Sequence, residues 1–221
     1  MRGLRSFSVG MAFGLAVAVM MAAAPSAMAA AAEEQSALLE LDPGRTVIAF
    51  KLDGSFHTTH GTFKLQRGTV KAEPATGKAE GLIVVDASSG ESGNSARDQR
   101  MKESVLETGS YPTITFSPRR INGHREPDGD FQAKLTGVLM LHGTKHEIVL
   151  DMHGHLRGRQ ITATCHFSIP YVEWGLKDPS ILFFKVAKEV EIDLTVEGHV
   201  TWIGSAESAG GIGRTLGGNP F

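Results

Sequence analysis

Apolar and polar residues alternate with period two along the C-terminal half of the chain. The clearest run covers residues 190–200, and two more cover 160–170 and 147–156. In the first run the apolar positions are Val190, Ile192, Leu194, Val196 and Val200. Successive side chains of a strand point to opposite faces, so this alternation places one face in a core and the other in water. The runs therefore predict half-buried β-strands.

Weaker runs of the same kind fill most of the chain before residue 147. They cover 46–52, 61–70, 78–87, 113–120 and 131–141. Turn-forming pairs separate several strands: Asn122-Gly123, Asp128-Gly129, Gly143-Thr144 and Arg157-Gly158. About eight antiparallel strands can close into a barrel that holds one ligand, and closure removes exposed sheet edges. A two-sheet sandwich has the same pattern, so an all-β domain is predicted and both architectures stay open.

One segment breaks the strand pattern with helical spacing. Ser95 and Asp98 form a start that resembles a capping box, with Ser95 as the N-cap. Met101 and Val105 share one helical face, and Gly109 is a candidate stop. We expect a short inserted helix that lies across one mouth of a barrel.

A second irregular segment, 174–185, is unusually rich in large apolar residues. Six occur around Asp178-Pro179: Trp174, Leu176, Ile181, Leu182, Phe183 and Phe184. One interpretation is a satellite hydrophobic cluster under the barrel end, and the other is a ligand-contacting role. Both interpretations place the segment at the mouth.

Residues 1–29 have the layout of a secretory signal peptide. Arg2 and Arg5 precede the apolar run 9–24, and Ala27-Met28-Ala29 forms a small-residue cleavage signal. The apolar run is shorter than the roughly 20 residues of a spanning helix, which favours cleavage over the alternative, an uncleaved anchor. We expect cleavage near Ala29 and a secreted protein. No cysteine comes directly after the cleavage site, which excludes a lipoprotein attachment.

The barrel domain is predicted to span 41–203. Residues 204–221 are rich in glycine and serine and predict a flexible tail. The chain has 22 basic and 24 acidic residues and a net charge of −2, without a basic block, so nucleic acid is not an expected partner. The single cysteine, Cys165, cannot form an intramolecular disulfide and is expected to be a buried, inert thiol. An intermolecular disulfide or a redox role is the alternative.

Candidate catalytic and metal-binding residues are few. His153 and His155 share one strand face, a geometry compatible with two metal ligands, but no third ligand has metal-like spacing. The sequence has no G-x-S-x-G elbow, no Cys–His signature and no phosphate-binding glycine loop. Glu189 and Glu191 lie on the outward face of the last strand. These observations favour solvated histidines and a protein that is not an enzyme.

Several segments, in order and spacing, resemble the YceI-like family. They are Gly61-Thr62-Phe63, Arg97-Asp98, Tyr111-Pro112-Thr113-Ile114-Thr115-Phe116, the run 135–145 (LTGVLMLHGTK) and the closing strand from Val190 to Val196. The resemblance extends from about Leu41 to Trp202. No single motif is decisive, whereas the ordered set is fairly specific.

The resemblance implies a lipocalin-like, eight-stranded antiparallel β-barrel with one short inserted helix. It also implies a bacterial periplasmic or secreted location, and a polyisoprenoid or similar amphiphilic lipid in the lumen. No other cofactor and no catalytic residue are implied, and a homodimer is a candidate assembly because dimers occur in the family. The apolar segment around Trp174 is typical of a subgroup, and the histidines at 153 and 155 match no family site. The identity of the lipid therefore stays open.

On this basis we expect apolar side chains to line the lumen and bind the ligand. They are Phe50, Phe63, Val84, Phe116, Leu139, Phe167 and Leu194, with Trp174 and Phe183 near a mouth. A slip of one residue would invert each strand's set. Burying a prenyl chain gains roughly 0.8 kcal/mol per CH₂-sized group, but a bilayer offers the same environment. A near-balanced transfer indicates a shuttle or reservoir with transient membrane contact.

Three other functions are considered. A metal- or haem-linked periplasmic redox protein requires His153 and His155 as ligands. An interaction module requires a packed core without a cavity. A lipid hydrolase is the least supported, because no triad is present.

Overall fold

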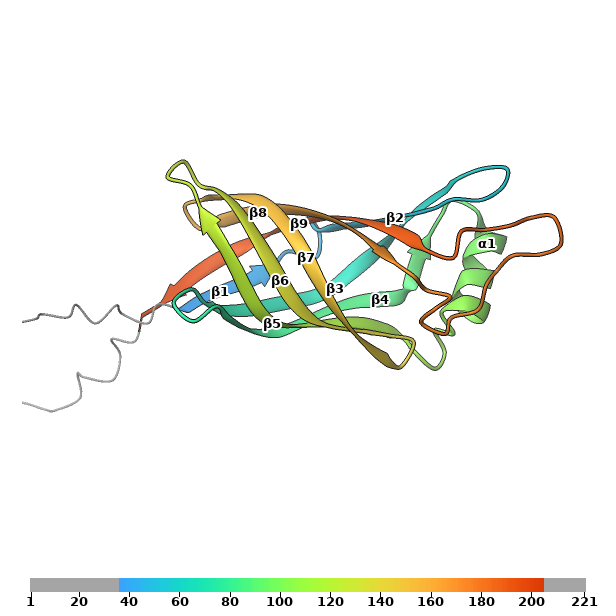
Figure 1. Ribbon diagram of the computed structural model, residues 1–221, viewed down its shortest axis with the longest axis horizontal. Helices are drawn as coiled ribbons and strands as arrows, with labels where there is room; N and C mark the ends of the chain where they lie inside the picture. The colour runs from blue at the N-terminus through green and yellow to red at the C-terminus, as the bar shows by residue number, and fades with distance from the viewer. Residues whose placement is uncertain (1–35, 205–221) are drawn as a thin grey trace, which may run out of the picture. The chain divides into compact units, whose positions relative to one another are not determined.

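The structure is a computed structural model that describes residues 36–204 (Figure 1). Nine β-strands account for most of the described chain. They are β1 (Ser36–Leu41), β2 (Val47–Leu52), β3 (Thr59–Glu73), β4 (Lys78–Glu91), β5 (Thr113–Arg125), β6 (Asp130–Leu141), β7 (Thr144–Arg157), β8 (Gln160–Ile169) and β9 (Val190–Ile203). The predicted leader (1–29) and the predicted tail, except Gly204, lie outside the described residues.

The nine strands form one closed antiparallel barrel. Strands β3 to β9 pair in chain order, and both β1 and β2 lie between β9 and β3. Because β1 and β2 share one position in the wall, the barrel has eight strand positions. The predicted lipocalin-like, eight-stranded barrel with a short helix is confirmed, and the closed pairing decides against the sandwich.

A local turn separates β1 from β2. Pro43 has no N–H to donate to the ladder, and the chain folds back so that the N–H of Thr46 donates to the carbonyl of Asp42 at 2.9 Å. The Asp42 N–H still donates to the carbonyl of Glu197 on β9 at 2.8 Å, so the turn stays attached to the wall. Strand β1 was not predicted, because Ala37-Leu38-Leu39 is a run of apolar residues without period-two alternation.

The inserted helix forms where predicted, with a different start. Helix α1 (Ser95–Arg100) continues as a π-helical turn, η1 (Met101–Val105). Its N-cap is Asn94, whose side-chain oxygen accepts a hydrogen bond from the Arg97 N–H at 3.0 Å. The prediction of Ser95 as the cap was therefore wrong by one residue. Asp98 instead accepts from the Ser92 N–H at 2.9 Å, which holds the loop before the helix.

The predicted stop of this helix at Gly109 was also wrong. The helix ends at Val105 with Leu106 as its C-cap, and the following Glu107 has the left-handed conformation, with φ of 46°. The side chain of Glu107 contacts the β6–β7 turn, where its carboxylate oxygen lies 2.8 Å from Nε2 of His142. This contact stabilises the left-handed conformation. Among residues 36–204, no helix has the length and apolar character needed to cross a membrane.

Candidate functional site

The barrel encloses a cavity of about 660 Å³. Its wall is almost entirely apolar, and side chains from all eight strand positions contribute to it. The cavity lies within the range of roughly 300–1,000 Å³ that is typical of small-molecule sites. The alternating pattern therefore builds a hollow interior.

The cavity occupies only one half of the barrel. Toward the other end the interior is filled by packed side chains, among them Val70, Ala79, Leu135 and Met152. These residues lie on β3, β4, β6 and β7, and none of them lines the cavity. The packed half closes the cavity at its inner end and supplies the hydrophobic core of the domain.

Three segments surround the mouth of the cavity. They are the β2–β3 connection, the α1–η1 helix and the long β8–β9 connection, and all three lie at the same end of the barrel (Figure 1). Each contributes to the lining: His57 from the first, Met101 from the second and Phe184 from the third. The helix is short and lacks buried residues, so it acts as a partial cover.

The mouth also carries the basic side chains of the cavity. Arg97, Arg100 and His57 line it there. The guanidinium of Arg97 is fixed because Nε donates to Oγ of Ser92 at 2.7 Å and a terminal nitrogen donates to the Ser92 carbonyl at 2.8 Å. An apolar interior with cationic groups at its entrance suits an amphiphile whose polar end remains at the mouth.

Six of the nine predicted lumen residues line the cavity. They are Phe50, Phe63, Phe116, Leu139, Phe167 and Leu194. The rings of Phe50 and Phe63 pack against each other, with centroids 5.4 Å apart. Their contact with a ligand stays a prediction, whereas their placement on one continuous inner surface is a feature of the structure.

Three predicted positions lie elsewhere. Val84 is buried, but its neighbours Ile83 and Val85 line the cavity, so the prediction selected the wrong face of β4. Three consecutive apolar residues have no period-two signal there. Phe183 is 83% exposed at the apex of a turn and does not line the cavity. Trp174 lies outside the cavity lining and stacks on His146.

Sequence reasoning missed the arginines of the mouth. Arg97 and Arg100 belong to the predicted helix, in which Met101 and Val105 were predicted to share one face, and both arginines line the cavity. Residues four apart lie on one helical face, so the position of Arg97 relative to Met101 and Val105 was a usable signal. The other omissions, such as Ile148 and Ile192, belong to the inward sets of β7 and β9 that the alternation already identified.

Two titratable groups inside the fold are held neutral. Burial raises the pKa of the Cys165 thiol to about 11, and the charge of Asp151 adds to this effect. Burial, together with the charge of Asp178, raises the pKa of Tyr171 to about 12. The Tyr171 hydroxyl donates to the Ala187 carbonyl at 2.7 Å, which ties the two ends of the β8–β9 connection together.

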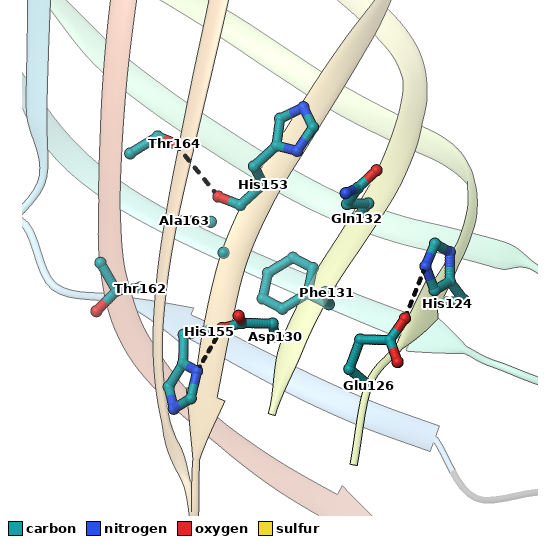
Figure 2. Close-up of a pocket in the computed structure, with 11 residues that line it drawn as sticks. His124, Glu126, Asp130, Phe131, Gln132, His153, His155, Thr162, Ala163 and Thr164 are labelled. Carbon is teal, nitrogen blue, oxygen red and sulfur yellow. Dashed lines mark hydrogen bonds and ion pairs between the residues drawn. The ribbon is translucent and has the colours of Figure 1, made fainter. Parts of the chain in front are cut away.

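The histidine strand forms a separate pocket on the outer wall, of about 440 Å³ (Figure 2). His153 and His155 project from β7, and Nδ1 of His155 lies 2.7 Å from a carboxylate oxygen of Asp130. Across the pocket, His124 pairs with Glu126 at 3.3 Å. Within residues 36–204, His, Cys, Asp and Glu side chains nowhere form a group of three or more that could hold a metal ion. The described geometry therefore gives the metal-linked alternative no ligand set.

The profile of the YceI-like domain matches residues 39–198 of this chain. The chain belongs to the YceI-like family. A search of curated proteins found no match.

Two solved structures share the fold. BcnA of Burkholderia cenocepacia is 20% identical, with a TM-score of 0.57 over 71% of this chain and 98% of its own. A polyisoprenoid-binding domain from Saccharophagus degradans, implicated in plant cell wall breakdown, is 17% identical, with a TM-score of 0.55 over 76% of this chain and 99% of its own. At these identities the similarity establishes a common fold.

Proposed function

We propose that this YceI-like protein binds one long apolar or amphiphilic lipid, with its chain inside the barrel and its polar end at the mouth. The observation that carries the proposal is the cavity of about 660 Å³ with an apolar wall. A polyisoprenoid is the ligand class that we favour. The similar domain from Saccharophagus degradans is described as polyisoprenoid-binding, which supports this choice.

The energetics favour a carrier or reservoir. Moving a prenyl chain from water into an apolar cavity gains roughly 0.8 kcal/mol per CH₂-sized group, but leaving a bilayer costs a similar amount. Transfer between membrane and barrel is then close to balanced, and the ligand can be collected and released. The predicted signal peptide supports a periplasmic or secreted carrier.

A binding role is preferred over catalysis because of how the polar residues are arranged. The inner wall is apolar, and its one buried polar residue, Thr46, uses its hydroxyl within the fold as a partner of Glu197. At the mouth, Ser92 is engaged by Arg97 and Asp98. Neither hydroxyl is paired with a histidine base, the arrangement that nucleophilic catalysis requires.

Solvent extraction tests the proposal directly. The full-length chain is expressed with its predicted leader in a bacterial host and purified without detergent. The protein is then extracted with chloroform–methanol, and the lipids in the extract are identified and quantified by mass spectrometry. We expect one class of long-chain lipid at close to one molecule per protein. An extract without lipid, together with failure of the purified protein to take up an added polyprenol, would count against the proposal. It would instead support the interaction module.

A further inference from the structure

Five large apolar side chains are exposed together at the mouth of the cavity. Phe56 comes from the β2–β3 connection, and Ile181, Leu182, Phe183 and Phe184 come from the β8–β9 connection. We call these five residues the apolar tip. Leu182 and Phe183 are 84% and 83% exposed, and Phe56 is 71% exposed. Exposed apolar residues are ordinary when scattered, but a contiguous group marks an interaction surface.

The tip is a built element of the fold. Ile181 and Phe184 form two backbone hydrogen bonds with each other, at 3.0 and 2.7 Å, which close a tight turn with Leu182 and Phe183 at its apex. The rings of Phe56 and Phe184 pack with centroids 5.2 Å apart. This aromatic contact joins the two connections into one surface.

Backbone hydrogen bonds fix the same two connections to each other. The Ser55 N–H donates to the Lys185 carbonyl at 2.9 Å, and the Ala187 N–H donates to the Asp53 carbonyl at 2.7 Å. Gly54 and Val186 form an isolated β-bridge between these bonds. The tip is therefore held at the mouth of the barrel by a small ladder, with Leu182 and Phe183 almost fully exposed.

Leu182 is a costly residue at its position. Its φ is 42°, a left-handed conformation that favours glycine and asparagine. Its side chain is also exposed, so within the monomer it gains little from burial. Leucine at this position is unfavourable for the backbone conformation and gains little burial within its own chain. This combination indicates that the Leu182 side chain contacts something outside the chain.

We propose that the apolar tip inserts into the surface of a lipid bilayer and sets the cavity mouth against the membrane. Ile181 and Phe184 belong to the tip and also line the cavity, so the apolar surface is continuous from the inserted tip into the barrel. A lipid chain then passes between membrane and cavity without crossing water. This inference extends the proposed function, on which it rests for its purpose, but docking is measurable without a ligand.

The charges around the tip indicate that apolar insertion drives the docking. The connection 170–189 carries three lysines and three acidic residues, and the apex itself has no charge. A convex apex of two large side chains suits a deformable bilayer interface, where the apolar part of a peripheral protein enters the boundary between headgroups and chains. We therefore expect binding to uncharged phosphatidylcholine vesicles with little dependence on salt.

Vesicle flotation tests the inference with the purified full-length chain and phosphatidylcholine vesicles that contain no other lipid. The double variant Leu182→Ser/Phe183→Ser removes the apex. The matched control, Leu82→Thr/Val149→Thr, removes two exposed aliphatic side chains from the barrel strands. We expect the apex variant to bind at least about tenfold more weakly, since burying each such side chain is worth that much in a partition constant. The control and a salt increase to about 0.5 M should leave binding nearly unchanged.

A single substitution separates docking from folding. Asn suits the backbone of residue 182, so Leu182→Asn should keep or raise the melting temperature while weakening vesicle binding. The inference is overturned if the wild-type chain does not float with vesicles, or if the apex variant floats equally well. It is also overturned if the tip instead forms a dimer that the apex variant abolishes. If lipid is extracted but the protein does not bind vesicles, the membrane-docking inference fails and the proposed carrier function is unaffected. If the protein binds vesicles but no lipid is extracted, the proposed carrier function fails and the docking role of the tip is supported.

Discussion

The imidazole ring of His146 lies flat against the indole ring of Trp174, with centroids 3.8 Å apart and planes 5° from parallel. His146 belongs to β7 and faces the same side of the wall as its partner Leu139. Its Nε2 atom is buried and has no hydrogen-bond partner within residues 36–204. Of the two predicted roles for Trp174, this contact supports packing against the barrel end.

Truncating Trp174 should therefore affect stability more than ligand binding. Trp174→Ala removes the stacked ring and its partly buried surface, and we expect a loss of about 2–3 kcal/mol in the free energy of unfolding. Trp174→Phe, which keeps a ring against His146, should lose less than half of that. Urea unfolding measures both variants. A Trp174→Ala protein with normal stability and impaired lipid uptake would restore the ligand-contacting role.

Gly61 is expected to control the shape of the cavity. A Cβ atom at this position would meet the ring of Phe50 and the backbone carbonyl of Glu91, so Gly61→Ala must displace the Phe50 ring, which lines the cavity, and the backbone at Glu91. We expect a loss of about 1–3 kcal/mol from overpacking, together with weaker uptake of an apolar probe. Gly109→Ala is the matched control, because a Cβ there meets no atom within 4 Å. Equal effects of the two substitutions on uptake would show that Phe50 does not shape the site.

The buried thiol of Cys165 gives a pH-dependent contribution to stability. Its pKa is about 11 in the folded protein and near 8.5 in an unfolded chain. Between these values the unfolded state has lost a proton that the folded state retains, so the contribution is complete below about pH 8.5 and falls as the pH rises toward 11. Urea unfolding at about pH 8 and 9.5 should show this fall in the wild type, and a smaller one in Cys165→Ala. An equal fall in the free energy of unfolding in the wild type and in Cys165→Ala would show that Cys165 does not cause the pH dependence.

The same thiol should react slowly in the folded state. Only the thiolate attacks a disulfide reagent, and the raised pKa of Cys165 keeps it protonated at neutral pH. We expect little reaction with dithionitrobenzoate in buffer and complete reaction of one thiol per chain in urea. Rapid reaction of the native protein would instead favour the intermolecular disulfide.

The sequence predicted the strands well because their two faces differ so clearly. Strand β9 runs from Val190 to Ile203, and the predicted run covered 190–200. The helix forms where the helical spacing of the sequence predicted it. Its N-cap is Asn94, because the amide oxygen of this residue accepts a hydrogen bond from the Arg97 N–H. The cap is decided by backbone conformation, which single-residue preferences do not fix.

The site was only partly predictable, because its volume is a property of the assembled barrel. Alternation identified Phe63 and Phe116 as inward, and could not distinguish the hollow half from the packed half. It also failed in Ile83-Val84-Val85, where all three residues are apolar, and at Phe183, where the chain is a turn. A periodic pattern assigns faces within regular strands and has no information about turns or empty space.

Ile148 and Val149 allow the most direct test of a hollow, lipid-binding interior. They are neighbours on β7, but Ile148 lines the cavity whereas Val149 is 53% exposed on the outer wall. Ile148→Trp fills empty space, and Val149→Trp adds the same ring outside. Each delipidated protein is titrated with a fluorescent polyprenol analogue, and its melting temperature is measured in parallel. We predict that Ile148→Trp stays folded and binds the probe at least about tenfold more weakly, while Val149→Trp binds like the wild type. Equal binding of the probe by both variants would contradict a hollow, lipid-binding interior. A large fall in the melting temperature of Ile148→Trp, as expected for overpacking a filled core, would contradict it as well.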